Sequence, residues 1–294
     1  MKKKVMKEST AWQIGAHTVM IIGSLLAILP FILLVIASFT DNQTALVNGY
    51  SFTPEKWSLE AYQYIASEWA TIGRAYLMTI LVTVIGTALS LVITSTFAFA
   101  VSNDKLPGHK ILMFLCIFTM LFNGGLVASY YVYSNIFHIK NTIWALIVPT
   151  FLMSPFNVVL VKNYFSNSIS PSILEAARMD GAGVFAVFTK IVMPLSVPIM
   201  ATVGLMTAIG YWNDWTNGLY YLTENGGAQY YTIQLVLNRI NENINFLANN
   251  SDVAAKAAQQ LPSTTMRMAI AVIGILPIMC AYPFFQKYFV KGIT

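Results

Sequence analysis

Long apolar runs separated by short polar segments dominate the chain. The apolar runs cover roughly residues 14–39, 72–101, 111–132, 142–161, 195–215 and 264–285. A helix needs about 20 apolar residues to cross a hydrocarbon core of about 30 Å, and each run reaches that length. Barrel strands would instead be alternating segments of about 10 residues, and the sequence has none. The pattern predicts an all-α polytopic membrane protein, with one transmembrane domain over residues 1–294 and six transmembrane helices.

Two of these runs contain residues that break helices. Asn123-Gly124-Gly125 interrupts the third run, and Pro149 and Pro155 lie in the fourth. We expect kinks there, with side chains of neighbouring helices satisfying the carbonyls that each break frees. The second run instead has small residues at every fourth position, which lets another helix approach closely. These residues are Gly86, Ser90, Thr94 and Ala98.

Two polar connections are long enough to carry structure of their own. Residues 40–72 are rich in Trp and Tyr, which concentrate at membrane interfaces, and a short helix is expected over residues 58–68. Residues 216–262 form the longest polar connection and are predicted to be an extracellular loop. Within this loop, residues 231–240 fit a strand and a helix equally well, because periodicity does not separate the two.

Composition agrees with a membrane location, and the positive charge sets the orientation. The chain is 56% hydrophobic and 10% charged, whereas soluble domains carry about 25% charged residues. With six crossings, most of the 17 Lys and Arg residues fall on the side of the N-terminus, which predicts cytoplasmic N- and C-termini. The basic start precedes an apolar run that is too long for a signal peptide, so we expect an uncleaved first span. That start comprises Lys2, Lys3, Lys4 and Lys7.

Several classes of function lack the residues that they need. The net charge of +5 comes without a basic cluster interleaved with aromatics, so membrane lipid rather than nucleic acid is the expected partner. His17, His109 and His138 are far apart, and Cys116 and Cys280 lie in apolar runs, so no metal, cofactor or catalytic site is predicted. No phosphate-binding loop of the Gly-x4-Gly-Lys-Ser/Thr form occurs, so ATP is not bound by that route.

The apolar runs also lack charged residues at mid-depth. Ion-coupled transporters place ionisable groups there, so energy coupling is expected outside the bilayer. The alternative, a self-sufficient secondary transporter or channel, is weakened further because no internal repeat is visible.

A helix–turn–helix is predicted on the cytoplasmic side, within residues 163–193. Ser172 and Glu175 have the spacing of a capping box. Gly181 and Gly183 follow Asp180, where the helix would end and the chain could turn through positive φ. A second short helix is expected over residues 184–193.

The same segment resembles the EAA motif of binding-protein-dependent ABC importer permeases. That pattern is Glu-Ala-Ala, three residues, Gly, nine residues, Ile, one residue, Leu-Pro. The chain matches its spacing throughout, with Met193 in place of leucine, a change that conserves volume. The matching residues and the flanking aspartate are Glu175, Ala176, Ala177, Asp180, Gly181, Ile191 and Pro194.

This resemblance implies one half of a type I ABC importer in a bacterial cell membrane. The helix carrying Glu175 and Gly181 would dock in a groove of a cytoplasmic ATPase, present in two copies, and Glu175 would pair with a basic residue there. Glu175 could alternatively only cap its own helix. A second permease subunit would complete a pseudo-symmetric heterodimer. An extracellular solute-binding protein would contact the 216–262 loop.

Aromatic and amide side chains provide a candidate solute path. The first group follows the fifth run and comprises Tyr211, Trp212, Asn213, Asp214 and Trp215. The second comprises Asn123, Tyr130 and Tyr133. Rings can stack on sugar faces while amides bind hydroxyls, although an interfacial aromatic belt or a simple helix break would use the same residues. The 211–215 segment, the Leu106-Pro107-Gly108 turn and the C-terminal residues 286–292 resemble the second membrane subunit of maltose-type carbohydrate permeases, which implies carbohydrate import and favours an oligosaccharide.

Overall fold

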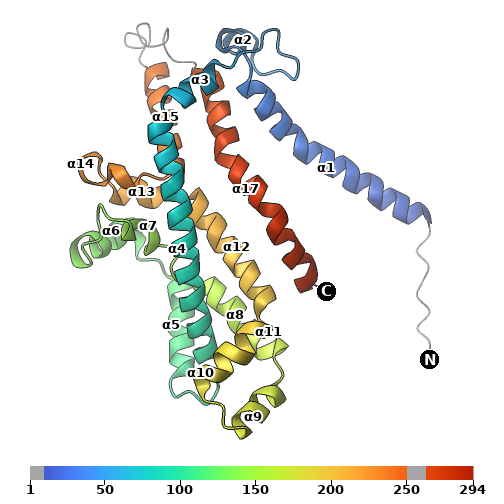
Figure 1. The fold of residues 1–294 in the computed structure, drawn as a ribbon, viewed down its shortest axis with the longest axis vertical. Helices are drawn as coiled ribbons and strands as arrows, with labels where there is room; N and C mark the ends of the chain where they lie inside the picture. The colour runs from blue at the N-terminus through green and yellow to red at the C-terminus, as the bar shows by residue number, and fades with distance from the viewer. Residues whose placement is uncertain (1–9, 250–262, 294) are drawn as a thin grey trace. The chain divides into compact units, whose positions relative to one another are not determined.

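The structure is a computed structural model that describes residues 10–249 and 263–293 (Figure 1). Most of these residues are helical, and they contain no β-strand beyond one isolated bridge between Thr40 and Trp57. The chain divides into two compact units, residues 1–68 with 241–276 and residues 69–240 with 277–294. The predicted basic start, with Lys2, Lys3, Lys4 and Lys7, and residues 250–262 of the predicted outer loop lie outside the described residues.

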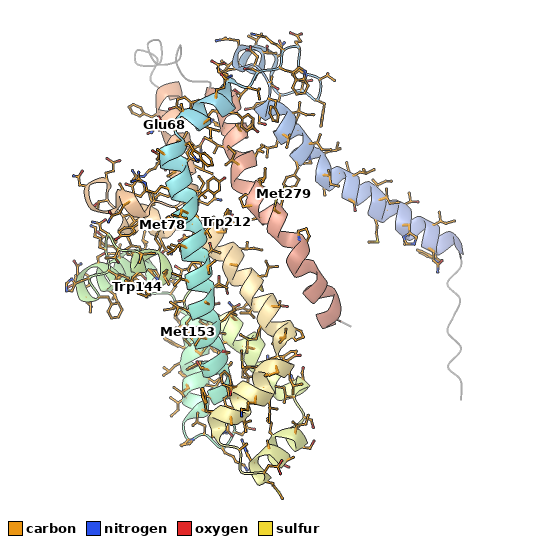
Figure 2. All side chains as sticks on the ribbon, viewed as in Figure 1. Glu68, Met78, Trp144, Met153, Trp212 and Met279 are labelled. Carbon is orange, nitrogen blue, oxygen red and sulfur yellow. The ribbon has the colours of Figure 1, made fainter. Side chains whose placement is uncertain are left out.

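The first unit begins with the long apolar helix α1 (Thr10–Ser38). Its segment Trp12–Ser38 is long and apolar enough to cross a membrane, and its most apolar stretch has no buried residue. Side chains project from all sides of this helix in Figure 2. Such a helix is covered by lipid or by another chain, because an apolar surface in water would be unfavourable. The first predicted run is therefore confirmed as one continuous helix.

Two short helices follow in the first unit. The Asp41 side chain caps α2 (Asn42–Asn48) by accepting a 3.3 Å hydrogen bond from the Thr44 N–H. The helix predicted at 58–68 is confirmed as α3 (Glu60–Ser67), whereas α2 was not predicted. The Asn42 side chain accepts a 3.1 Å bond from the Thr264 N–H and thereby ties α2 to the first residues of α17 (Ser263–Ile293).

The second unit is built on α4 (Trp69–Val101), a helix of 33 residues. It packs against α8 (Pro155–Ser168) and α12 (Val197–Asn213). A Cβ added at Gly86 of α4 would lie 2.5 Å from the Tyr211 ring of α12, so only glycine allows this contact. The close approach predicted from the small residues of α4 is thus confirmed, and it forms around a buried core of Val82, Leu146, Ile147, Tyr211, Leu222 and Leu235.

The third and fourth apolar runs are each broken, as Asn123-Gly124-Gly125 and Pro149 predicted, but the breaks are larger than kinks. The third run contains α5 (His109–Leu121) and α6 (Gly125–Tyr131), which continues as a π-helix, η1 (Val132–Ile136). The two parts are bent by 120°, because Gly125 adopts a φ of +82° while the Asn123 side chain accepts its N–H at 2.8 Å. The fourth run contains only α7 (Trp144–Ile147), a non-helical segment and then α8.

Most of the remaining helices in the described residues are short. The short ones are α9 (Pro171–Met179), α10 (Val184–Val187), η2 (Phe188–Val192), α11 (Met193–Leu195), α13 (Thr216–Tyr221), α14 (Glu224–Gly227) and η3 (Ala228–Tyr230). The longer helix α15 covers Ile233–Asn249. The ambiguous residues 231–240 thus form a helix for most of their length. Within the described ranges two helices, α1 and α4, could each span a membrane. The number rises to four if each of two bent helix pairs, residues 109–136 and 184–213, counts as one span. Thr264–Cys280 is a shorter apolar helix, and the count of six crossings stays a prediction.

Candidate functional site

The predicted turn after the first helix of the helix–turn–helix is present. Helix α9 ends at Met179, and Gly181 follows with a φ of +81°. The Ala182 N–H donates to the Ala177 carbonyl at 2.9 Å, while the Gly181 N–H donates to the Arg178 carbonyl at 3.1 Å. This pair of bonds is a Schellman motif, which needs a residue that tolerates a left-handed backbone. Gly181 is therefore required by its conformation, since no atom lies within 4 Å of the position of an added Cβ.

The beginning of α9 differs from the prediction. The helix starts at Pro171, and the residue before it is Ser170, whose hydroxyl pairs with that of Ser172 at 2.8 Å. Ser172 thus lies inside the first turn, so the predicted capping box between Ser172 and Glu175 is wrong. Proline favours the first position of a helix because its fixed φ suits it and its missing N–H needs no partner there.

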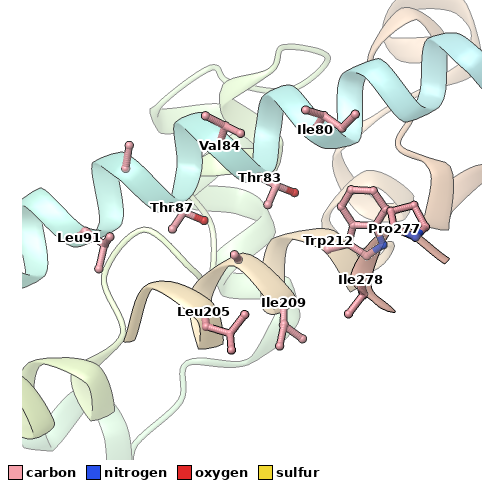
Figure 3. A pocket seen from close by; sticks show the side chains of 12 residues that line it. Ile80, Thr83, Val84, Thr87, Leu91, Leu205, Ile209, Trp212, Pro277 and Ile278 are labelled. Atoms are coloured by element: carbon pink, nitrogen blue, oxygen red, sulfur yellow. The ribbon is translucent and has the colours of Figure 1, made fainter. Parts of the chain in front are cut away.

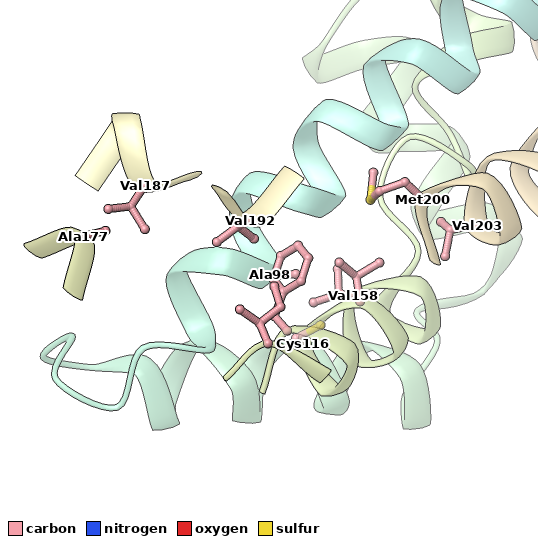
Figure 4. Close-up of a cluster of buried hydrophobic side chains, with 11 residues drawn as sticks. Ala98, Cys116, Val158, Ala177, Val187, Val192, Met200 and Val203 are labelled. Atoms are coloured by element: carbon pink, nitrogen blue, oxygen red, sulfur yellow. The ribbon is translucent and has the colours of Figure 1, made fainter. Parts of the chain in front are cut away.

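One face of the helix–turn–helix packs on the rest of the second unit, to which it belongs (Figure 4). Ala177 of α9 is 8% exposed and joins a buried cluster with Val187, Val192 and Ala98. Ile191 is half-buried against the same cluster. Two residues of the motif, Ala177 and Ile191, therefore attach the helix pair to the rest of the unit and do not face outward.

The opposite face of the helix pair is exposed. Glu175, Ala176, Asp180 and Gly181 are exposed, as is Pro194 in α11. Large apolar side chains accompany them, with Met179 89% exposed and Phe185 77% exposed. Glu175 forms no ion pair with any residue that the structure describes. The outward face of the helix pair thus combines charged and apolar side chains.

A second candidate site is a cavity of about 830 Å³ in the same unit. Its lining combines amides, hydroxyls and aromatic rings, and none of the lining side chains is charged. The polar and aromatic lining residues are Thr119, Phe122, Asn123, Ser129, Tyr133, Thr150, Thr216, Asn217, Tyr220 and Tyr221. The structure therefore brings the predicted residues Asn123 and Tyr133 together in one cavity.

Tyr130 lies next to this cavity but does not line it. Its ring stacks on that of Tyr221 at a centroid distance of 5.8 Å and an interplanar angle of 12°. The Lys140 ammonium donates a 2.7 Å hydrogen bond to the Tyr130 hydroxyl. Tyr133 meets the same Tyr221 ring edge-on at 5.9 Å. Tyr130 and Lys140 thus support the aromatic wall of the cavity from behind.

The predicted group at 211–215 is not in the cavity. Tyr211 is fully buried, and its hydroxyl donates a 2.7 Å bond to the Ile147 carbonyl. Trp212 lines a separate apolar cavity of about 470 Å³ with residues of α4 and with Pro277 and Ile278 (Figure 3). Asn213 and Trp215 are exposed elsewhere.

The side chain of Asp214 supports the cavity by bonding to backbone N–H groups of α13. Its carboxylate accepts hydrogen bonds from the N–H groups of Thr216 at 3.1 Å and Asn217 at 3.2 Å. These bonds cap the start of α13, and that helix carries Asn217, Tyr220 and Tyr221 into the cavity wall.

Most of the polar and aromatic lining residues were not predicted, among them Thr150, Asn217, Tyr220 and Tyr221. Asn217 and Tyr220 are three residues apart, a spacing that places side chains on one face of a helix. That spacing could have indicated from the sequence that these two side chains lie together. Pro149 indicated a break in the helix. Nothing in the sequence indicated where the side chain of the next residue, Thr150, would lie.

Comparison with known proteins places these features in a family. The model of the family "Binding-protein-dependent transport system inner membrane component" matches residues 91–294. The chain is 36% identical to the polygalacturonan/rhamnogalacturonan transport system permease protein YtcP of Bacillus subtilis, over 92% of this chain and 91% of that protein. It is 34% identical to the protein LplC of Bacillus subtilis, over 91% and 88% of the two chains.

The fold is also that of a solved structure. A bacterial ABC transporter involved in the import of the acidic polysaccharide alginate matches with a TM-score of 0.79 and 28% identity, over 95% of this chain and 96% of that chain. The predicted family and all-α fold class are thereby confirmed. The chain belongs to the binding-protein-dependent transport system inner membrane components, the membrane-embedded permeases of ABC transporters.

Proposed function

We propose that this permease forms half of the translocation path for a saccharide, an oligosaccharide by preference. The cavity of about 830 Å³ carries this proposal, because its size and its lining suit a solute surface rich in hydroxyls. Aromatic rings offer faces for stacking, and Asn123, Thr150 and Asn217 offer groups for hydrogen bonds. The names of two relatives, a polygalacturonan/rhamnogalacturonan permease and an alginate importer, support a saccharide as the substrate class.

The helix pair within residues 163–193 is proposed as the docking surface for a cytoplasmic ATPase. The exposed Glu175, the Schellman turn at Gly181 and the apolar side chains of Met179 and Phe185 support this role. The N- and C-termini then lie in the cytoplasm, and the 216–262 loop faces the outside. There the loop would meet a solute-binding protein.

The complete importer in this proposal contains four further chains. A second permease subunit supplies the other half of the path, two copies of an ATPase hydrolyse ATP, and the binding protein delivers the solute. This permease itself has no catalytic role. The long α1, whose most apolar stretch has no buried residue, is available for contact with lipid or with the second permease subunit.

Transport by the reconstituted complex tests the substrate class. The complex would be placed in proteoliposomes with its binding protein, and uptake of trigalacturonate and maltotriose measured with and without internal ATP. Uptake that requires both ATP and the binding protein is expected. Uptake without ATP would instead favour the alternative of a channel or secondary transporter.

Charge reversal at Glu175 tests the docking surface. Glu175→Lys should leave the protein in the membrane but abolish the stimulation of ATPase activity by the loaded binding protein, because a basic partner would then be repelled. Gly181→Pro should do the same by preventing the turn. Asp104→Lys serves as the control, since the side chain of Asp104 is 97% exposed and lies outside the helix pair. Normal stimulation in both Glu175→Lys and Gly181→Pro would exclude this docking role.

A further inference from the structure

The non-helical segment between α7 and α8 contains a strained residue. Thr150 has a φ of +70°, in the left-handed region that β-branched residues rarely adopt. The N–H of Phe151 donates to the Pro149 carbonyl at 2.8 Å, so Thr150 occupies the centre of a tight three-residue turn. Strain of this kind persists only where the surrounding structure determines the conformation.

Three carbonyls of this segment are each bound by a side chain from a different helix. The Ile147 carbonyl accepts from the Tyr211 hydroxyl at 2.7 Å, and the Pro149 carbonyl accepts from the Asn217 amide at 3.4 Å. The Phe151 carbonyl accepts from the Ser90 hydroxyl at 3.0 Å. Because α12, α13 and α4 all contribute, the backbone on both sides of Thr150 is fixed.

The residues beside these anchored positions line the cavity. Val148, Thr150 and Leu152 all belong to the wall of the 830 Å³ cavity. Thr150 is exposed, and within the part of the chain that the structure describes its hydroxyl has no hydrogen-bond partner. A residue of a cavity wall that combines an anchored backbone with a free hydroxyl has the features of a pre-organised binding group.

The identity of the residue points the same way. A turn with positive φ favours glycine, since glycine has no Cβ to clash with the backbone. Threonine is among the residues least suited to that conformation. The turn alone therefore gives no reason for threonine, whereas a hydroxyl in the cavity does.

We propose that Thr150 is a solute-contacting residue, whose hydroxyl hydrogen-bonds a hydroxyl of the transported saccharide and contributes to selectivity. This inference rests on the proposed function of the cavity. The rigid turn holds the group in place, so binding does not have to order a mobile side chain.

Three substitutions separate the hydroxyl from the strain. Thr150→Ser keeps the hydroxyl, Thr150→Val keeps the β-branched shape without it, and Thr150→Gly removes both the hydroxyl and the strain. We expect Thr150→Ser to transport like the wild type. Thr150→Val and Thr150→Gly should each raise the half-saturation concentration for uptake about two- to tenfold, the effect of one neutral hydrogen bond.

Thermal stability should follow a different order. Thr150→Gly should melt at or above the wild-type temperature because the strain is relieved, while Thr150→Val should not exceed it. His138→Gly is the matched control, since His138 also has a positive φ, +53°, but does not line the cavity. Its uptake should equal that of the wild type.

Uptake of trigalacturonate and maltotriose by reconstituted complexes, measured over a range of concentrations, provides the readout. If Thr150→Val and Thr150→Gly match the wild type while uptake remains dependent on ATP, the role of Thr150 is refuted and the proposed function stands. If the wild-type complex takes up neither saccharide, the proposed function and the role of Thr150 are refuted together.

Discussion

The contact between Gly86 and Tyr211 leads to a quantitative prediction for Gly86→Ala. The added methyl group would lie 2.5, 2.7 and 2.9 Å from three carbon atoms of the Tyr211 ring. Non-bonded carbon atoms rest about 3.5–4.0 Å apart, so the ring must withdraw by about 1 Å. That ring is fully buried, and it has no free space into which it could move without cost.

The withdrawal also breaks a hydrogen bond. The Tyr211 hydroxyl lies 2.7 Å from the Ile147 carbonyl, and lengthening by about 1 Å takes the pair beyond the range of a hydrogen bond. Overpacking costs about 1–3 kcal/mol and a buried unpaired carbonyl costs about 1–3 kcal/mol. Alanine has a better helix propensity than glycine, which offsets about 1 kcal/mol of this destabilisation. The net destabilisation is therefore about 3 kcal/mol, or a fall of about 6–12 °C in melting temperature.

The assay is thermal unfolding of the purified complex in detergent, followed by the fraction that remains monodisperse. Gly204→Ala in α12 is the matched control, because its added methyl meets only the mobile end of Leu91 at 3.3 Å. We expect the control to stay within about 2 °C of the wild type. Equal melting temperatures for Gly86→Ala and Gly204→Ala would refute the steric argument.

A double-mutant cycle tests the same contact independently. Tyr211→Leu removes the ring that the new methyl group would strike, so the combined variant Gly86→Ala with Tyr211→Leu should lose less stability than the sum of the two single variants. Additive losses would show that Gly86 and Tyr211 do not interact in the way the structure indicates.

A further variant probes a buried polar group. Thr79→Val keeps the shape of a side chain that accepts a 2.8 Å bond from the Ile233 N–H, so stability should fall by about 1–3 kcal/mol in the same unfolding assay. Unchanged stability would contradict the bond.

The sequence allowed prediction of the long helices but not of the paths taken at the breaks. Residues 14–39 and 72–101 were predicted because length and hydropathy alone require a helix in a bilayer. Asn123-Gly124-Gly125 and Pro149 marked the correct breaks. The size and direction of each bend depend on partners far away in the chain, such as Tyr211 and Asn217, which local patterns do not identify.

The candidate site was predicted in part for a similar reason. Asn123 and Tyr133 do share a cavity with hydrogen-bonding and aromatic walls. Tyr211 was selected for the same chemistry but is a core residue, since the glycine opposite it creates a space for its ring. A tyrosine that lines a solute path, packs in a core or lies at a membrane interface can have the same neighbours in the sequence. Only the residue facing it distinguishes these roles.

The turn from Asp180 to Ala182 was the best predicted detail. The positive φ at Gly181 follows from the position of glycine after a helix, independently of tertiary contacts. The start of the same helix was predicted incorrectly, because Ser170 and Ser172 offer two compatible N-caps two residues apart. Helix ends commonly differ by this amount from a sequence-based assignment.

The anchored segment around Thr150 also constrains how the chain is inserted during synthesis. Its carbonyls at Ile147 and Pro149 receive their partners from Tyr211 and Asn217, about 65 residues later in the chain. Unpaired carbonyls are costly in lipid, so residues 148–154 have no stable place at membrane depth until α12 and α13 have been made. The segment must remain near water or the insertion machinery during that interval. We therefore expect the segment to reach its final position only after α13 has been made.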